Sequence, residues 1–297
     1  MPSSSFSTTW GNTLLTALAP VIWGSTYIVT SELLPSGRPF TAALIRVLPA
    51  GLLLILCMRR FPVRHEWGRL LVLAALNIGI FQALLFVAAY RLPGGLAAVL
   101  GAIQPLLVIA LSCGVDRRPP ALLALVASVL SVVGMAVLLL SPDTAWDAAG
   151  VVAALFGAAS MAAGTFLTRH WKMDMPVLAL TGWQLLLGGA LLLPVAWLAD
   201  APLPPLSLTQ VTAYAYLCLA GALLAYALWF RGIAHLSPVA VSSLGLLSPL
   251  TAVVLGWVLL GQAMSGLSFF GLFIVLTSVL AVQWATAQPQ KAIVSPR

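Results

Sequence analysis

Charged residues are scarce in this chain. Only 7% of its 297 residues are Asp, Glu, Lys or Arg, whereas 61% are hydrophobic. A soluble domain carries about 25% charged residues, so a water-soluble fold of this composition would have no polar surface. The scarcity of charge therefore predicts a membrane protein rather than a soluble enzyme or binding module.

Cysteine and histidine are also few. The three cysteines lie in apolar stretches without CxxC or Cys/His spacing, so no metal site is predicted. No cluster of His and carboxylate residues falls within an apolar stretch, which argues against an intramembrane protease or metalloenzyme. The pattern GxxxxGK followed by Ser or Thr does not occur, so we expect neither ATP nor a cofactor.

Basic residues outnumber acidic ones, 14 to 7, and give the chain a net charge of +7. They do not gather in one patch, so nucleic acid is not an expected partner. They lie instead in short clusters between long apolar stretches, which is the arrangement that sets membrane topology.

Ten apolar stretches are long enough to cross a bilayer as helices, because a spanning helix needs about 20 mostly apolar residues. The stretches are apolar all round and do not alternate, which favours helices over the strands of a barrel. The sequence thus predicts an all-α polytopic membrane protein. The predicted spans are residues 13–31, 40–58, 70–90, 94–114, 119–140, 148–168, 177–199, 209–230, 238–260 and 266–286.

The basic residues divide unequally between the two sides of the membrane. Eleven lie on the side of the N-terminus and two, Arg38 and Arg91, on the other side. The positive-inside rule then puts both termini in the cytoplasm of a bacterial inner membrane. Residues 1–12 hold no Lys or Arg, so the first apolar stretch is expected to remain as a helix and not to be cleaved as a signal peptide.

The chain contains an internal repeat. A shift of 144 residues pairs the Gly-x-x-x-Pro of residues 101–105 with that of residues 245–249. We therefore predict two five-helix units, residues 1–145 and 146–297. Five is odd, so the second unit enters the membrane from the opposite side. Inverted repeats of this kind are a frequent basis for alternating access around a central site.

Arg46 is the only charged side chain within a predicted span. Charge at membrane depth is expensive, which makes this residue a candidate for function. An equally supported alternative is that the side chain snorkels, or binds carbonyls of a broken helix. Its counterpart in the second unit is Gln184, or the adjacent Trp183, so the halves differ chemically here.

Polar and aromatic residues share one face of the third and eighth spans. Gln82, Phe86 and Tyr90 follow helical spacing, and Tyr226 occupies the matching face with Trp229 beside it. Such a face suits a substrate with a ring and a zwitterionic head. For any single Gln or Ser, the simpler interpretation is a hydrogen bond between helices.

Pro105 and Pro249 occupy equivalent positions within the fourth and ninth spans. A proline inside a helix removes a backbone hydrogen bond and kinks the helix. One such proline means little in a membrane helix, but two related by the repeat predict a hinge or the lining of a cavity.

Several helix motifs occur together with the ten-span pattern: Ala19-Pro20, Trp23-Gly24-Ser25-Thr26-Tyr27, Arg46, residues 101–106, Trp183-Gln184 and Ser248-Pro249-Leu250. With these motifs the chain resembles the drug/metabolite transporter superfamily, EamA type. Within it, the chain is most similar to bacterial YddG-type exporters of aromatic amino acids. Small multidrug antiporters of the superfamily use a membrane Glu in the first helix, whereas here Glu32 lies at the end of that span.

Together these features predict a secondary transporter that exports small neutral metabolites, foremost aromatic or other amino acids, by alternating access. An exporter of cationic lipophiles is the alternative within transport. A membrane enzyme or lipid scramblase is the alternative from another class. The expected partners are a small-molecule substrate and the lipid bilayer. We expect substrate contacts from Trp23, Tyr27, Arg46, Gln82, Phe86, Tyr90, Gln104, Ser160, Gln184, Tyr226, Trp229, Ser243 and Ser248, with Pro105 and Pro249 as hinges.

Overall fold

The computed structural model describes residues 3–92, 94–117, 119, 121–140, 146–262, 264 and 266–287. Within these residues the secondary structure is entirely helical, and ten helices are long and apolar enough to cross a membrane. The predicted fold class and span number are therefore confirmed. The predicted boundary between the two units, at residues 145 and 146, borders a segment outside the described residues.

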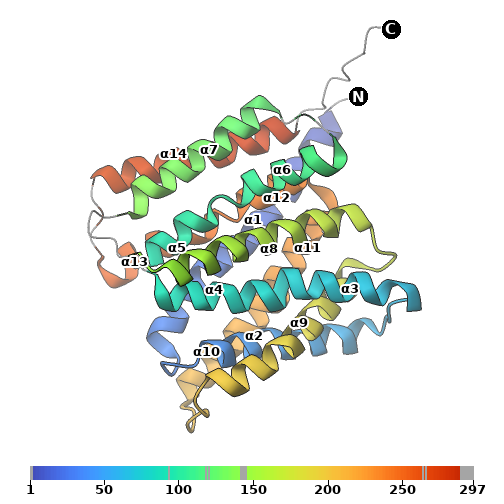
Figure 1. The fold of residues 1–297 in the computed structure, drawn as a ribbon, viewed down its shortest axis with the longest axis vertical. Coiled ribbons are helices and arrows are strands. Elements are labelled where there is room, and N and C mark those ends of the chain that lie inside the picture. Colours follow the sequence, from blue (N-terminus) through green and yellow to red (C-terminus); the bar gives the residue numbers. More distant parts are fainter. Residues whose placement is uncertain are drawn as a thin grey trace.

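Six of the ten spans are uninterrupted helices, and Figure 1 shows the bundle to which they belong. These six are α1 (Ser3–Leu33), α2 (Pro39–Met58), α7 (Leu122–Leu139), α8 (Ala148–Trp171), α9 (Val177–Ala199) and α14 (Gly266–Ala287).

The other four spans are interrupted. The third consists of η1 (Arg64–Glu66), α3 (Trp67–Ala74), η2 (Ala75–Gly79) and α4 (Ile80–Arg91). The fourth consists of α5 (Gly94–Gly101) and α6 (Gln104–Asp116), the eighth of α10 (Leu208–Cys218), η3 (Leu219–Leu224) and α11 (Ala225–His235), and the ninth of α12 (Pro238–Leu244) and α13 (Leu247–Leu260). The eighth span is longer than predicted and includes Arg231, so Arg46 is not the only charged residue within a span.

The interruptions occur at matching places. Both η2 and η3 are π-helical, and their first residues, Ala75 and Leu219, are 144 residues apart. The fourth and ninth spans break just after Gly101 and just before Leu247. A π segment has i→i+5 hydrogen bonds in place of the i→i+4 bonds of an α-helix, and it frequently occurs at functional sites. The same local departures from α-helix thus recur in both halves of the chain.

The helices around Pro105 and Pro249 are not the kinked continuous helices that the sequence predicted. Pro105 lies in the first turn of α6 and Pro249 in the first turn of α13. Proline is tolerated in the first turn because the amide that it lacks would have had no helical partner there. Each proline therefore begins a new helix after a break.

Glycine lets paired helices approach closely. In the contact of α2 with α9, a Cβ on Gly51 would meet the backbone of Leu186, and one on Gly182 would lie 2.8 Å from Leu54 Cβ. In the contact of α7 with α14, a Cβ on Gly271 would lie 2.5 Å from the backbone nitrogen of Leu138. Small residues at helix crossings drive packing in membranes, where burial of apolar surface gives no net gain.

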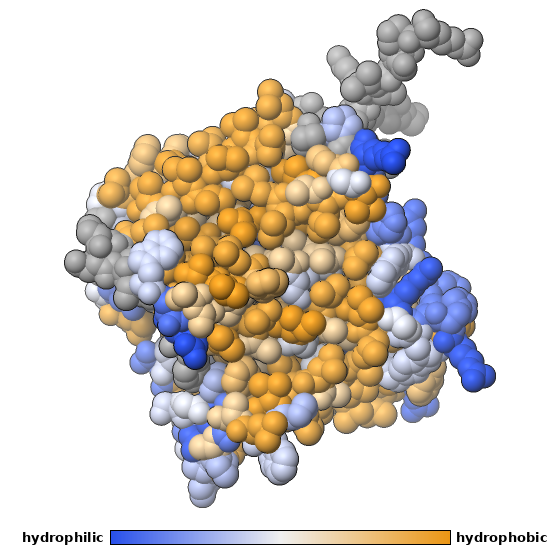
Figure 2. All heavy atoms as spheres, viewed as in Figure 1, coloured by the Kyte–Doolittle hydropathy of each residue, from blue (hydrophilic) through white to orange (hydrophobic). Residues whose placement is uncertain are grey.

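The outer surface is apolar. Leu122, Trp197 and Leu208 are 74%, 82% and 80% exposed. Figure 2 shows hydrophobic residues covering most of the visible face, with hydrophilic residues gathered at its right-hand and lower-left edges. This is the surface expected of helices that contact lipid across the width of a bilayer.

The two ends of the bundle can be told apart by their charges. The ends of α2, α6 and α8 that carry Arg59, Arg117 and Arg169 form what we call the basic end. The start of α1 and the end of α14 lie at this same end (Figure 1). There Thr13 Oγ1 donates to Gln283 Oε1 at 3.4 Å. We call the other the opposite end.

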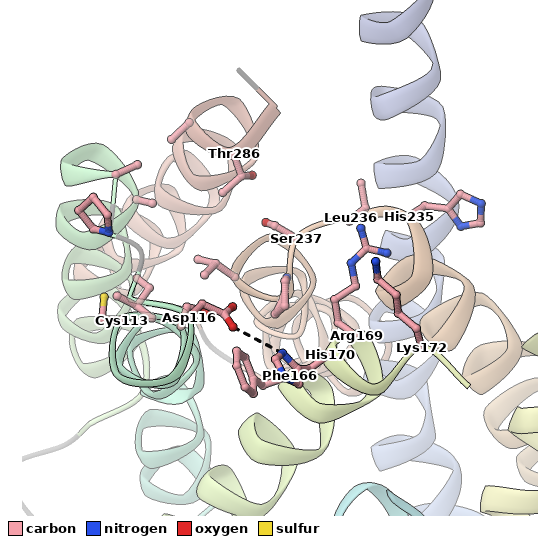
Figure 3. Close-up of a pocket in the computed structure, with 18 residues that line it drawn as sticks. Cys113, Asp116, Phe166, Arg169, His170, Lys172, His235, Leu236, Ser237 and Thr286 are labelled. Atoms are coloured by element: carbon pink, nitrogen blue, oxygen red, sulfur yellow. Dashed lines mark ion pairs between the residues drawn. The ribbon is translucent and has the colours of Figure 1, made fainter. Parts of the chain in front are cut away.

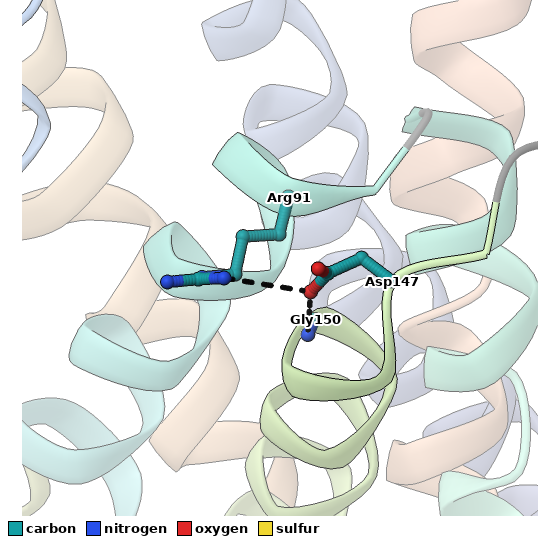
Figure 4. A network of polar contacts seen from close by, with 3 residues as sticks. All are labelled: Arg91, Asp147 and Gly150. Carbon is teal, nitrogen blue, oxygen red and sulfur yellow. Dashed lines mark hydrogen bonds and ion pairs between the residues drawn. The ribbon is translucent and has the colours of Figure 1, made fainter.

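At the opposite end, Asp147 caps α8. Its Oδ1 accepts from the backbone N–H of Gly150 at 2.6 Å and lies 3.7 Å from Arg91 Nη1 (Figure 4). A Cβ on Gly150 would lie 2.7 Å from Leu92 Cγ, so α8 can begin this close to the end of α4 only with glycine there. The contact joins the end of the third span to the start of the sixth.

Candidate functional site

Arg46 lies in α2, about two turns or roughly 10 Å from the opposite end. Its Nη2 donates to the carbonyl oxygen of Gly221 at 3.0 Å. Gly221 belongs to the π segment η3, and such segments frequently occur at functional sites. A Cβ at Gly221 would lie 3.2 Å from Thr26 Cγ2 and 3.6 Å from Arg46 Nε, so the absence of a side chain lets the guanidinium approach the backbone.

Trp23 binds the same carbonyl. Its Nε1 donates to Gly221 O at 2.9 Å, and its ring lies 4.9 Å from the ring of Tyr226 and 5.2 Å from that of Trp229. One backbone oxygen thus accepts from two side chains of the first two spans. This arrangement fixes both the indole and the guanidinium against η3.

Tyrosine side chains surround the guanidinium. Arg46 interacts electrostatically with Tyr27, Tyr216 and Tyr226. Tyr27 also hydrogen-bonds the side chain of Ser248, and Tyr216 OH lies 2.6 Å from Ser25 Oγ. We call Trp23, Tyr27, Arg46, Tyr216 and the Gly221 carbonyl the η3 cluster.

Two tyrosines of the η3 cluster are partly exposed. Thr16 and Trp23 share the inward face of α1 with Tyr27, and Thr16 is fully buried, yet Tyr27 is 50% exposed. Tyr216 is 38% exposed.

A closed layer lies next to the η3 cluster. Gln82 Nε2 donates to Tyr226 OH at 3.1 Å, and these residues are 144 positions apart. Gln82, Tyr226 and Trp229 are each 1% exposed, and Phe230 is 2% exposed. The layer separates the accessible aromatic and cationic groups from the basic end of the bundle.

Arg46 has no carboxylate partner in the described part of the chain. The ion pairs there are Arg91 with Asp147 and His170 with Asp116. Its Nε is buried without a hydrogen-bond partner. An unpaired guanidinium at membrane depth is costly, so the site has an unused capacity to bind an anion.

Gln184, the predicted counterpart of Arg46, lies against the other π segment. Its Oε1 accepts from Asn77 Nδ2 at 2.8 Å, and Asn77 belongs to η2. The same nitrogen of Asn77 lies 3.1 Å from Thr168 Oγ1, and Ser160 Oγ donates to the carbonyl of Leu76 at 2.8 Å. We call Asn77, Ser160, Thr168 and Gln184 the η2 cluster.

The remaining predicted residues are spread more widely. Ser243 accepts from Gln283 Nε2 at 2.9 Å and links α12 to α14. Phe86 packs edge-on against Phe40 at 6.2 Å. Gln104 begins α6, and its Nε2 is buried without a partner. The side chain of Tyr90 lies outside the described part of the structure.

A separate cavity of about 720 Å³ opens at the basic end and includes none of the predicted site residues. Asp116, Arg169, His170, Lys172 and His235 supply its ionisable lining, and His170 Nδ1 lies 3.5 Å from Asp116 Oδ1 (Figure 3). The sequence analysis missed this cavity because its lining comes from the ends of several spans, which carry no shared motif.

Asn77, Gly221 and Tyr216 also escaped prediction. A polar residue or a glycine within a span is unremarkable when taken alone. The one signal that could have found the first two is the repeat itself, because Asn77 and Gly221 are also 144 residues apart. Within the described residues, no group of three or more His, Cys, Asp or Glu side chains could hold a metal ion.

Comparisons with known proteins agree with this architecture. The chain is 46% identical over 268 residues to protein PecM of Dickeya dadantii (strain 3937), covering 89% of this chain and 90% of PecM. It is 28% identical to the uncharacterized inner membrane transporter YedA of Escherichia coli (strain K12), over 93% of this chain and 92% of YedA. A crystal structure with 18% identity superposes with a TM-score of 0.78 over 93% of this chain and 97% of the other, which shows a shared fold.

The family comparison is more specific. The EamA-like transporter family matches the chain twice, over residues 10–140 and 148–284. These matches and the transporter names of the relatives identify a multi-pass inner-membrane transporter and not an enzyme. The chain belongs to the EamA-like transporter family.

Proposed function

We propose that this transporter exports small molecules that carry a carboxylate and a flat apolar group, foremost aromatic amino acids, by alternating access. The observation that carries the proposal is Arg46, an unpaired guanidinium within an accessible aromatic cluster. The resemblance to YddG-type exporters points to the same substrate class.

The carboxylate preference follows from the positive charge of Arg46, which has no carboxylate partner among the described residues. One nitrogen, Nη2, donates to Gly221 O, and Nε is buried without a partner. Guanidinium groups bind carboxylates through two parallel hydrogen bonds. A cation in this position would be repelled by Arg46, which disfavours the alternative of a cationic lipophile exporter.

The preference for a flat apolar group follows from the neighbouring rings. Trp23, Tyr27 and Tyr216 lie near the guanidinium, and Tyr27 and Tyr216 keep part of their aromatic surface exposed. Aromatic side chains stack on or pack edge-on against planar ligands. An amino acid with an aromatic side chain combines both required groups in a small molecule.

Alternating access is supported by the recurrence of structure at the 144-residue spacing. The two π segments, the Gln82–Tyr226 contact and the Asn77–Gly221 equivalence all follow it. The family also matches each half separately. Inverted repeats would expose a central site to each side in turn. The distribution of basic residues supports cytoplasmic termini, which would make the η3 cluster accessible from the periplasm.

The test is a panel of labelled compounds in proteoliposomes that contain the purified transporter. We expect counterflow of phenylalanine, tyrosine or tryptophan to exceed that of phenethylamine and tetraphenylphosphonium. Because no described carboxylate lies beside Arg46, we expect this exchange to proceed without a pH difference. Transport of the cations with none of the amino acids would refute the proposed substrate class.

A further inference from the structure

We propose that the cavity of about 720 Å³ at the basic end, the basic-end cavity, is an entry site that binds an amino acid as a zwitterion. It is distinct from the η3 cluster, because none of its lining residues belongs to that cluster. The inference rests on the proposed function for the direction of transport and for the class of the ligand.

The basic-end cavity lies between the two halves of the chain. From the first half it is lined by the last turns of α6 and the start of α7. From the second half it is lined by the last turns of α8, the start of α12 and the end of α14. In transporters built from two repeats, substrate sites lie at the interface between the repeats, and ligand pockets have volumes of about 300–1,000 Å³. A small substrate that enters from the basic end would therefore meet this cavity first.

Charges of both signs line the cavity. Figure 3 shows the Asp116 carboxylate on one side of the His170 ring, and the side chains of Arg169 and Lys172 on the other side. An amino acid carries its ammonium and its carboxylate on the same carbon atom, so a site that binds both groups needs opposite charges close together. The η3 cluster differs in this respect, because Arg46 has no carboxylate partner among the described residues.

These charges are available to a ligand. Within the described residues, Arg169 and Lys172 form no ion pair, and Arg169 Nη1 donates to the neutral carbonyl of Ala234. Asp116 lies 3.5 Å from His170, whose side chain is 47% exposed and carries a charge only when it is protonated. An ion pair that is this exposed to water is weak. The ammonium of a ligand could therefore take the place of His170 beside Asp116.

An aromatic surface lies beside the charges. The ring of His170 stacks on that of Phe166, with centroids 5.6 Å apart and planes inclined by 18°. Phe166 is buried and His170 is exposed, so Phe166 supports the imidazole ring from within the bundle. An exposed ring held in this way can pack against the side chain of an aromatic amino acid. The basic-end cavity thus combines a cation, a carboxylate and a ring within one small space.

Cys113 lines the cavity and supplies a local reporter of occupancy. In the full-length protein, Cys57 and Cys218 are replaced by Ala. Alkylation of Cys113 by N-ethylmaleimide is then timed in detergent with and without phenylalanine. The ratio of the two rates within one variant cancels any change in the reactivity of the thiol itself. We expect saturating phenylalanine to slow the alkylation by about fivefold or more.

Two related ligands and two variants separate the opposite charges. Phenylpropionate lacks the ammonium and phenethylamine lacks the carboxylate, so each should require a concentration about five- to tenfold higher than phenylalanine for half-protection. Asp116→Asn should abolish the preference for phenylalanine over phenylpropionate. Lys172→Gln should reduce the preference over phenethylamine, and it leaves the bond from Arg169 to the Ala234 carbonyl in place.

Two further variants show whether the effects belong to this site. Arg64→Gln is the matched control, because Arg64 is an exposed cation at the basic end that lies outside the cavity lining. Neither Arg64→Gln nor Arg46→Gln should change the protection of Cys113. Since the charges of the entry site are exposed to water, we expect half-protection at a phenylalanine concentration about tenfold or more above that which half-saturates the η3 cluster.

Absence of protection at Cys113, together with the same result for a Thr286→Cys reporter on the α14 wall of the cavity, would overturn the proposal. Equal protection by the three ligands, or an effect of Arg64→Gln as large as that of Lys172→Gln, would also overturn it. Counterflow of phenylalanine without protection would refute the entry site and leave the proposed function intact. Protection without counterflow would refute the proposed transport and leave the binding site intact.

Discussion

The two π segments occupy equivalent places in the two halves of the chain but have different chemistry around them. At η3, a cation, an indole and two phenols gather near a single glycine carbonyl, and both phenols are partly exposed. At η2, neutral amide and hydroxyl groups bond one another in a fully buried network. The scaffold is repeated, whereas the side chains placed on it are not.

This difference between η2 and η3 shows how two equivalent segments of a repeated fold can take different roles in binding a substrate. In both halves a carbonyl of the π segment accepts a hydrogen bond from a side chain of another helix, and polar backbone groups at membrane depth must be satisfied by protein or water. Arg46 uses one of these groups as an anchor and keeps part of its guanidinium for a ligand. Gln184 is neutral. Burying this side chain at η2 therefore does not require a charged group to be removed from water.

The largest effect is expected from removing the charge that distinguishes the clusters. Arg46→Gln should lower transport of phenylalanine by about 10- to 100-fold, because a hydrogen bond to a charged group contributes about 1.5–3 kcal/mol. Arg46→Lys keeps the charge but lacks the planar fork and should restore only part of the rate. Counterflow in proteoliposomes, normalised to the amount of folded transporter, measures the transport rates of both variants.

Gln184→Ala is the matched substitution in the other half. It removes a neutral hydrogen bond from the η2 cluster, and we expect it to alter turnover more than apparent affinity. If Arg46→Gln and Gln184→Ala reduced affinity equally, the two clusters would be equivalent in function and the comparison would fail.

A smaller difference is expected between the two donors to the π carbonyls. Trp23→Phe keeps an aromatic ring but removes the N–H that binds Gly221 O, and it should weaken phenylalanine binding by about five- to tenfold. Ser160→Ala removes the donor to Leu76 O and should leave binding within about twofold. Equilibrium binding to the purified variants tests this contrast, and a larger loss in Ser160→Ala would reverse our assignment.

The smallest effects are expected at the helix breaks. Because Pro105 and Pro249 begin α6 and α13, Pro105→Ala and Pro249→Ala restore a backbone donor without adding bulk. Both variants should fold, with turnover lowered by about two- to fivefold, as measured by counterflow in proteoliposomes. Wild-type turnover in both at normal expression would show that these prolines are not hinges.

Much of the fold could be predicted from the sequence because the bilayer imposes it. The thickness of the hydrocarbon core sets helix length, and charge is confined to the ends of spans, so spacing between charges located all ten helices. The length of the eighth span was underestimated because Arg231 was taken to mark its end, whereas the helix continues to His235.

The site was only partly predictable. Arg46 stood out because charge within a span is rare, and its contact with a carbonyl of an interrupted helix was one of the two interpretations considered. The π segments gave no signal, because a change of hydrogen-bond register needs no particular residue. Tyr216 and Asn77 were missed because their roles depend on which helices become neighbours.

The most direct test of the account compares binding of two ligands that differ by one carboxylate. Equilibrium dialysis of labelled phenylalanine and labelled phenethylamine against the purified transporter gives the preference without any contribution from turnover. We predict a preference for phenylalanine of about tenfold or more in the wild type and its loss in Arg46→Gln. A preference that survives unchanged in Arg46→Gln, or that favours phenethylamine in the wild type, would contradict the account.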